Sequence, residues 1–269
     1  MSTTSMTGNN MYLVETALLT HGIHSISNED ILCRWPDRNK NIVFLDRGEI
    51  RIDDIESYLD FRVDVEKIHR VDMNTIEEAI NKKCSAALTA SATMRICAER
   101  EIPFAVTAGM GGIGPIKGEE LCLDLPALET LPVKLISCGP KDMLDRRETY
   151  RWLKEHEVVV TDLGRNFSTG YVFCGESITL SNCTEEDFLF TPHGLLIHEI
   201  SESKRVEDKE ILRRAVQEGY KKQLEGANFH PAVNEALDTM TNGCSSFLQL
   251  DALIANIERI EKIIENIEK

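Results

Sequence analysis

Aromatic residues, basic residues and long apolar runs are all scarce in this sequence. Aromatic side chains make up 6% of its 269 residues, and 30 Lys and Arg against 45 Asp and Glu leave a formal net charge of −15. No apolar run approaches the roughly 18 residues that a membrane-spanning helix needs. Because an acidic surface repels phosphodiesters and anionic lipids, we expect neither a nucleic-acid polymer nor a membrane as a partner.

The cysteines also lack the spacing that would give them a special role. The 8 cysteines are scattered, with no CxxC pair and no Cys/His cluster at zinc spacing, so reduced thiols are the default. Residues 1–10 are polar and lack the basic and apolar regions of an export signal. We therefore expect a cytoplasmic protein with a flexible tail over residues 1–10 and a single domain over residues 11–269.

The chain does contain short β-branched runs that alternate with helical stretches, which is typical of an α/β protein with a mostly parallel or mixed sheet. The runs predict strands over 42–45, 86–89, 104–107, 133–137, 158–161 and 195–198. The stretches between them predict helices over 75–82, 92–100 with Ser91 as its cap, 145–156 and 208–224. Over 248–269, apolar residues at spacings of three or four predict an amphipathic helix, packed on its own core or at a subunit interface.

A glycine-rich loop follows the strand predicted over 104–107. Three glycines within residues 109–114 match the spacing GxGxxG, but Pro115 interrupts the helix that a dinucleotide site requires there. We favour a small phosphate or carboxylate site, in which backbone N–H groups of the loop converge on the anion between Thr107 and Lys117. A purely structural turn is the alternative.

Two ionisable residues adjoin apolar runs. Lys141 follows the strand predicted over 133–137, at the carboxyl end of the sheet, where ligands of open α/β sheets bind. A desolvated lysine there can act as a Schiff-base nucleophile, whereas a surface lysine at a helix start is the simpler interpretation.

Glu15 interrupts the apolar run 12–22, where burial would raise its pKa and suit it to proton donation. His21, in the same run, is either a packing residue or a catalyst.

Together these segments resemble the pseudouridine-5′-phosphate glycosidase family, also called indigoidine synthase A-like proteins. The resemblance covers most of the chain. It rests on an ordered series of segments at 14–22, 67–72, 89–94, 107–113 and 132–145. It implies an α/β/α sandwich, a homotrimer and a divalent cation, usually Mn²⁺.

The resemblance also implies a reaction, cleavage of the C–C bond between ribose 5-phosphate and a nucleobase. A carbon leaving group has no lone pair to protonate, so opening the ribose onto a lysine imine supplies an electron sink. By resemblance Lys141 is that nucleophile, and Glu15 is the acid that protonates the ring oxygen or the departing base carbon. Lys67 falls on the family's substrate-binding lysine, and Ala90 falls on the position of a substrate-contacting valine.

Several segments depart from the family pattern, two of them at the expected metal ligand and substrate pocket. Where the family reads D-I-S-A-D, residues 120–124 read Glu-Leu-Cys-Leu-Asp. By resemblance Glu120 takes the place of the metal-ligand aspartate, and the substrate segment becomes Cys122, Leu123 and Asp124. The family's C-terminal A-N-I-A aligns with residues 252–255, Ala-Leu-Ile-Ala, which removes a polar group from the expected pocket.

The sequence therefore predicts a C-glycosidase that acts on a ribose 5-phosphate C-nucleoside with a base such as uracil. Two alternatives stand beside it. One is a C-glycoside synthase that acts on a different base. The other is a catalytically silent paralogue that binds a sugar phosphate or a partner protein.

Overall fold

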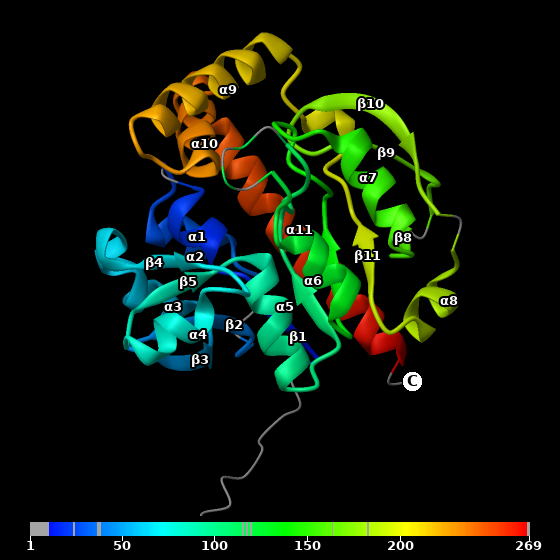
Figure 1. Ribbon diagram of the computed structural model, residues 1–269, viewed down its shortest axis with the longest axis horizontal. Coiled ribbons are helices and arrows are strands. Elements are labelled where there is room, and N and C mark those ends of the chain that lie inside the picture. The colour runs from blue at the N-terminus through cyan, green and yellow to red at the C-terminus, as the bar shows by residue number, and fades with distance from the viewer. Residues whose placement is uncertain are drawn as a thin grey trace, which may run out of the picture.

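The computed structural model describes residues 11–23, 25–36, 39–114, 116, 118, 120–162, 164–181 and 183–267. The tail expected over residues 1–10 lies outside these described residues. A nine-stranded mixed sheet runs through the described chain (Figure 1). In spatial order its strands are β4 (His69–Val71), β5 (Ala86–Leu88), β2 (Ile42–Asp46), β1 (Tyr12–Val14), β6 (Phe104–Val106), β7 (Lys134–Ser137), β11 (Gly194–Ile197) and β8 (Val160–Thr161), with β3 (Glu49–Asp53) paired to β2.

The central strands of the sheet, from β1 to β11 in spatial order, pair in parallel. β1 lies parallel to β2 and β6, β6 to β7, and β7 to β11, whereas β2 is antiparallel to β3 and β5. The carboxyl ends of β1, β6 and β7 therefore meet at one edge of the sheet. Residues that follow these strands are brought together even though they are far apart in the sequence.

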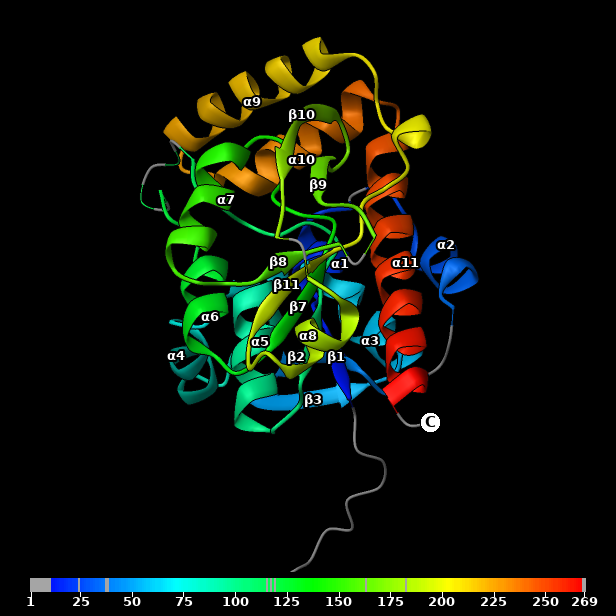
Figure 2. The same ribbon diagram turned by 90° about the vertical axis from the view of Figure 1, so that its right-hand side faces the viewer.

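Alternating side chains of the strands feed two cores on opposite faces. Tyr12 and Val14 belong to one core and Leu13 to the other, as the period of two in a strand requires. Helices α2 (Asn28–Arg34), α3 (Ile55–Phe61) and α11 (Cys244–Ile267) contribute to the first core, and α4 (Ile76–Asn81), α5 (Ala90–Glu99), α6 (Asp124–Thr130) and α7 (Arg146–Glu155) to the second. Figure 2 shows the sheet between these two layers, so the predicted α/β/α sandwich is confirmed.

The remaining elements lie around the carboxyl edge and the far end of the sheet. Near that edge are α1 (Ala17–His21), the 3₁₀ segment η1 (Arg62–Lys67), and the paired helices α9 (Lys209–Leu224) and α10 (Phe229–Met240) (Figure 1). A two-stranded sheet of β9 (Phe167–Gly170) and β10 (Cys174–Thr179) lies beyond α7, and α8 (Glu185–Phe190) and η2 (Glu202–Lys204) complete the described elements.

Every element predicted from the sequence is present, but many elements were not predicted, among them β1, β4 and α10, which carry or adjoin pocket residues. All six predicted strands exist within a residue or two of their bounds, and so do the four internal helices. The predicted cap of α5 is wrong, because Thr89 and not Ser91 caps this helix. The backbone N–H of Ser91 donates to Asp124 instead. The predicted C-terminal helix is α11, whose Leu253, Ile257 and Ile260 are fully buried, as packing on its own core requires.

Within the part of the chain that the structure describes, no helix combines the length and hydropathy needed to cross a bilayer. All 8 cysteines are described and none of them forms a disulfide, in agreement with the expected reduced thiols.

Candidate functional site

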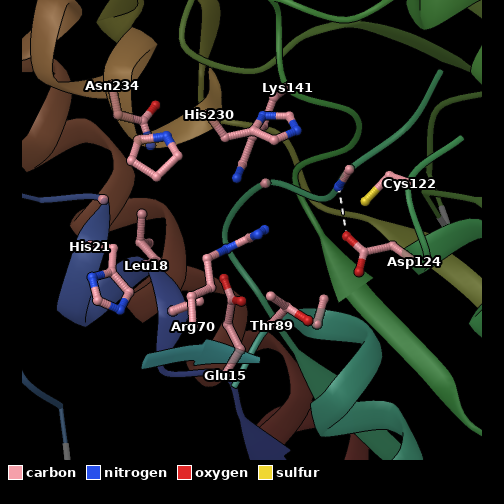
Figure 3. A pocket seen from close by; sticks show the side chains of 16 residues that line it. Glu15, Leu18, His21, Arg70, Thr89, Cys122, Asp124, Lys141, His230 and Asn234 are labelled. Atoms are coloured by element: carbon pink, nitrogen blue, oxygen red, sulfur yellow. Dashed lines mark hydrogen bonds between the residues drawn. The ribbon is translucent and has the colours of Figure 1, made fainter. Parts of the chain in front are cut away.

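A pocket opens at the carboxyl edge of the sheet, below α10 (Figure 3). Its walls come from strand ends, from the glycine-rich loop and from two helices that lie over the edge. The lining residues are Glu15, Ala17, Leu18, His21, Gly22, Arg70, Thr89, Ala90, Gly109, Gly111, Cys122, Asp124, Lys141, His230, Pro231 and Asn234. The structure thus brings together six of the residues considered from the sequence, namely Glu15, His21, Ala90, Cys122, Asp124 and Lys141.

Glu15 is a buried carboxyl group at the end of β1. Its backbone N–H donates to the carbonyl of Val106, and its Oε1 accepts a 2.7 Å hydrogen bond from the Thr107 hydroxyl at the end of β6. Burial raises the pKa of Glu15 to about 7, an effect opposed by the charge of Lys141 and by the Thr107 hydrogen bond. Such a carboxyl group can both give and take a proton near neutral pH.

Lys141 faces Glu15 from the loop after β7, and Figure 3 shows its amine directed into the pocket. Gly139 allows this turn, since its φ of 111° is one that L side chains rarely adopt. The turn is fastened to the glycine-rich loop by two 3.0 Å bonds, from Met110 N–H to the Gly139 carbonyl and from Lys141 N–H to the Met110 carbonyl. The lysine backbone is therefore fixed relative to the end of β6.

Arg70 supplies a second cation. It lies on β4, is half-buried, and lines the same pocket as Lys141. The pocket is therefore equipped to hold a small anion although the protein as a whole carries a net charge of −15. Lys67, the substrate-binding residue expected by resemblance, lies apart from the pocket lining at the end of η1, exposed and paired with Asp64.

Asp124 joins two walls of the pocket. Its Oδ1 accepts a 2.9 Å bond from the N–H of Ser91 in α5, and its Oδ2 accepts a 2.7 Å bond from the N–H of Gly111. Cys122 packs so closely there that a Cβ added to Gly111 would lie 2.0 Å from its sulfur, which explains why this position is glycine. Asp124 lines the pocket, and its hydrogen bonds show that it positions the backbone on either side.

The N–H groups of the glycine-rich loop are not free to bind an anion, contrary to the sequence prediction. The N–H groups of Met110, Gly111 and Ile113 donate to Gly139, Asp124 and Thr149 respectively. The expectation that these amides converge on an anion is therefore wrong for those three positions, because acceptors elsewhere in the chain occupy them. Lys117, proposed beside this loop, lies outside the described residues.

Helix α10 contributes three lining residues that the sequence interpretation missed, His230, Pro231 and Asn234. Burial lowers the pKa of His230 well below its usual value, and the charges of Lys141 and Arg70 act in the same direction. The imidazole is therefore neutral when the two cations are charged. The run Phe229-His-Pro opens an ordinary amphipathic helix, and no local signal indicates that it covers the active edge.

A buried amide also supports the end of β6. Asn256 Nδ2 donates a 2.7 Å bond to the Thr107 carbonyl, and its Oδ1 lies 3.1 Å from His198 Nδ1. Asn256 lies just after residues 252–255, the segment that the resemblance aligns with A-N-I-A. Helix α11 therefore places a buried amide beside the end of β6.

The remaining predicted residues lie outside the pocket lining. Leu123 is half-buried beside the start of α6, and Glu120 is exposed, with its Oε1 accepting a 3.2 Å bond from Gly118 N–H. Among the described residues no group of three or more His, Cys, Asp and Glu side chains is arranged to hold a metal ion. From the described residues, a cation at Glu120 would thus have at most a partial set of protein ligands.

Comparison with known proteins gives consistent matches over most of the chain. The family model described as indigoidine synthase A like protein matches residues 42–265. The pseudouridine-5′-phosphate glycosidase of Staphylococcus aureus (strain MW2) is 26% identical over 236 residues, which are 83% of this chain and 74% of that protein. Among such relatives the match covers between 32% and 87% of the relative's own length.

Two solved structures share the fold. An indigoidine synthase A-like protein from Thermotoga maritima MSB8 superposes with a TM-score of 0.73 at 18% identity, covering 96% of this chain and 93% of that one. The prealnumycin C-glycosynthase AlnA in complex with ribulose 5-phosphate superposes with a TM-score of 0.69 at 20% identity, covering 91% and 87%. The predicted fold class is thereby confirmed.

We predict that the Glu15 carboxyl group titrates near pH 7 and that Thr107→Val raises its pKa further, because the hydroxyl stabilises the carboxylate. Infrared spectra recorded against pH would follow the group, with Glu15→Gln used to identify its signal. Thr107→Ser keeps a hydroxyl and is the matched control. A Glu15 pKa near the ordinary 4.5, or one that Thr107→Val leaves unchanged, would contradict this electrostatic description.

Proposed function

The chain belongs to the indigoidine synthase A-like family, and from this premise we propose that it is an enzyme that breaks or forms the C–C glycosidic bond between ribose 5-phosphate and a nucleobase such as uracil. The observation that carries the proposal is the meeting of Lys141 with Glu15, a carboxyl group whose pKa is about 7, in one pocket. An amine and an acid that shares its pocket are what imine chemistry on a sugar needs.

In the cleavage direction the first step opens the ribose ring. The unprotonated amine of Lys141 attacks C1′ while Glu15 gives its proton to the ring oxygen, so that the C1′–N bond forms as the C1′–O4′ bond breaks. The nitrogen then loses a proton, which the Glu15 carboxylate can take. The product is an open-chain sugar whose C1′ carries both the lysine nitrogen and the base.

The second step releases the base. The nitrogen lone pair forms a C=N bond to C1′, the C–C bond breaks, and the base carbon receives a proton. Water then hydrolyses the imine and yields ribose 5-phosphate and free Lys141. One carboxyl group can serve every proton transfer near neutral pH only if its pKa lies close to 7, as that of Glu15 does.

The same imine supports the reverse reaction. Free base and ribose 5-phosphate would form the C–C bond by retracing these steps, so direction depends on the concentrations of the reactants. The fold is shared with a protein described as a C-glycosynthase, which supports including this direction in the proposal. We favour an active enzyme over a silent paralogue because Glu15 and Lys141 both line the pocket.

The phosphate of the sugar is assigned to Arg70. Its guanidinium is a planar, permanently charged donor that suits phosphate oxygens, and Figure 3 shows it between Glu15 and Lys141. Because His230 is neutral and the Lys141 amine acts as the nucleophile, the guanidinium of Arg70 is the positive charge left to hold the phosphate. Lys67 stays in the proposal as a residue that contacts substrate only if η1 moves toward the pocket.

The divalent cation, the homotrimer and the cytoplasmic location expected from the sequence are also part of the proposal. Glu120 is the carboxylate that we assign to Mn²⁺. Because it is exposed and the described residues form no ligand cluster around it, water would supply coordination positions that they leave open. No step above is routed through the cation.

We predict that borohydride traps ribose 5-phosphate on Lys141 as a reduced imine. Intact mass and peptide mass spectrometry would locate the adduct on the wild-type protein. Lys141→Met abolishes it, while Lys154→Met, which removes an exposed lysine from α7, leaves it unchanged. An adduct of equal yield on Lys141→Met would remove Lys141 from the mechanism.

We predict that Arg70→Met raises the half-saturating concentration of ribose 5-phosphate about tenfold or more, because a charge-assisted hydrogen bond contributes about 1.5–3 kcal/mol. Adduct formation with unphosphorylated ribose should change little. Lys67→Met, made at an exposed position, is expected to have the smaller effect. The reverse order of the two variants would show that Lys67 and not Arg70 holds the phosphate.

We predict that Mn²⁺ accelerates turnover of the wild-type protein and that Glu120→Gln loses this response, since carboxylate oxygen suits a hard divalent ion. Initial rates with and without a chelator, and after addition of Mn²⁺, would be measured for both proteins. Rates that are indifferent to the chelator in the wild type would argue for a site that needs no metal.

A further inference from the structure

Asn234, on α10, carries a buried amide that the rest of the described protein leaves unpaired. The residue is 4% exposed, and its side chain takes part in no hydrogen bond with another described residue. Its neighbours on the buried face of α10, such as Val233 and Leu237, are apolar. Because burial of an unpaired amide opposes folding, an apolar side chain would stabilise the protein better at this position. A ligand that pairs with the amide would reverse that balance.

The Asn234 amide lies beside Lys141. Among the described residues, Asn234 and Lys141 are the two that line both the pocket of Figure 3 and the small cavity behind it. Figure 3 shows Asn234 and His230 on the opposite side of the pocket from Glu15. A carbon atom bonded to the Lys141 nitrogen would therefore have the Glu15 carboxyl group on one side and the Asn234 amide on the other.

The space around Lys141 is narrow at its inner end and widens outward. About 30 Å³ is open in the pocket of Figure 3, whereas a groove that shares His21, Arg70 and Pro231 with it has about 470 Å³. One water molecule needs about 10–15 Å³ of such space, so the inner end takes only about two or three groups of that size. The first carbons of an open-chain sugar fit there, and the rest of the substrate extends past Arg70 into the groove.

The two carboxyl groups of the inner end already have partners in the protein. Glu15 accepts a hydrogen bond from the Thr107 hydroxyl, and Asp124 accepts bonds from two backbone N–H groups. The Asn234 amide has neither role, so both its donor and its acceptor can be used by a ligand.

We propose that Asn234 binds the hydroxyl group on C2′ of the sugar and thereby makes the enzyme select ribose 5-phosphate over 2-deoxyribose 5-phosphate. This inference rests on the proposed function, in which C1′ is bonded to the Lys141 nitrogen. C2′ is one bond further, so its hydroxyl group falls within reach of a side chain that borders Lys141. An amide and a hydroxyl group each offer a donor and an acceptor, so the two are chemically matched.

The test compares two sugars on the same lysine. Ribose 5-phosphate and 2-deoxyribose 5-phosphate would each be trapped on Lys141 with borohydride, and adduct mass would give the half-saturating concentration of each. The readout is the value for the 2-deoxy sugar divided by the value for ribose 5-phosphate. Comparing this ratio between proteins cancels the different tendencies of the two sugars to open their rings.

The variant is Asn234→Leu, which is close to asparagine in size and removes both the donor and the acceptor. Asn266→Leu, the same change at an exposed position on α11, is the matched control.

We expect Asn234→Leu to lower the ratio about tenfold, since tenfold corresponds to about 1.4 kcal/mol, the size of one or two hydrogen bonds. The loss should come from weaker trapping of ribose 5-phosphate, and Asn266→Leu should keep the wild-type ratio. Without ligand, Asn234→Leu should unfold at the wild-type temperature or above it, because it removes a buried amide that has no partner. A purely structural role would instead lower the unfolding temperature and affect both sugars alike.

Each contrary result has a separate meaning. A wild-type protein that traps 2-deoxyribose 5-phosphate at lower concentration than ribose 5-phosphate overturns the proposed selection without any variant. An unchanged ratio in Asn234→Leu, or in Asn234→Ala if the leucine variant does not fold, overturns the role of Asn234. Absence of both adducts on the wild-type protein would instead overturn the proposed function itself, and the inference with it.

Discussion

Two backbone hydrogen bonds accepted by Asp124 hold together the parts of the molecule on which the pocket depends. One comes from Ser91 in the first turn of α5 and the other from Gly111 in the loop after β6. Hydrogen bonds to a carboxylate are among the stronger ones in proteins, and both of these are buried. The loop after β6 is also hydrogen-bonded to the turn that carries Lys141. The placement of Lys141 opposite Glu15 therefore depends on Asp124, although Asp124 itself bonds only backbone N–H groups.

The reactive residues could be predicted from the sequence because their signals are local. β1, β6 and β7 are short apolar runs, and Glu15, Thr107 and Lys141 directly follow such runs or the turn after them. Parallel pairing then brings the three strand ends to one edge. The resemblance to a known family added the roles of Glu15 and Lys141, which the runs alone do not specify.

The rest of the site depends on contacts between distant segments, which no local pattern records. The glycine-rich loop appears free in the sequence, yet Ile113 N–H is taken by Thr149 across the second core. Lys67 and Arg70 lie on either side of the start of β4, and only the three-dimensional path of that strand shows which of them lines the pocket. His230 arrives on a helix whose amphipathic pattern would fit many positions on the surface.

The order of the elements along the chain has a consequence for biosynthesis. The apolar face formed by Tyr12, Phe104 and Ile136 is covered by Leu253 and other residues of α11, the last described helix. A nascent chain therefore leaves this face of the sheet exposed on the ribosome until α11 has emerged, and until then it can complete neither the fold nor the pocket. Pairings of this range make folding slow and leave unfinished chains prone to aggregation. Shielding by a chaperone during synthesis would matter more for this protein than its modest size indicates.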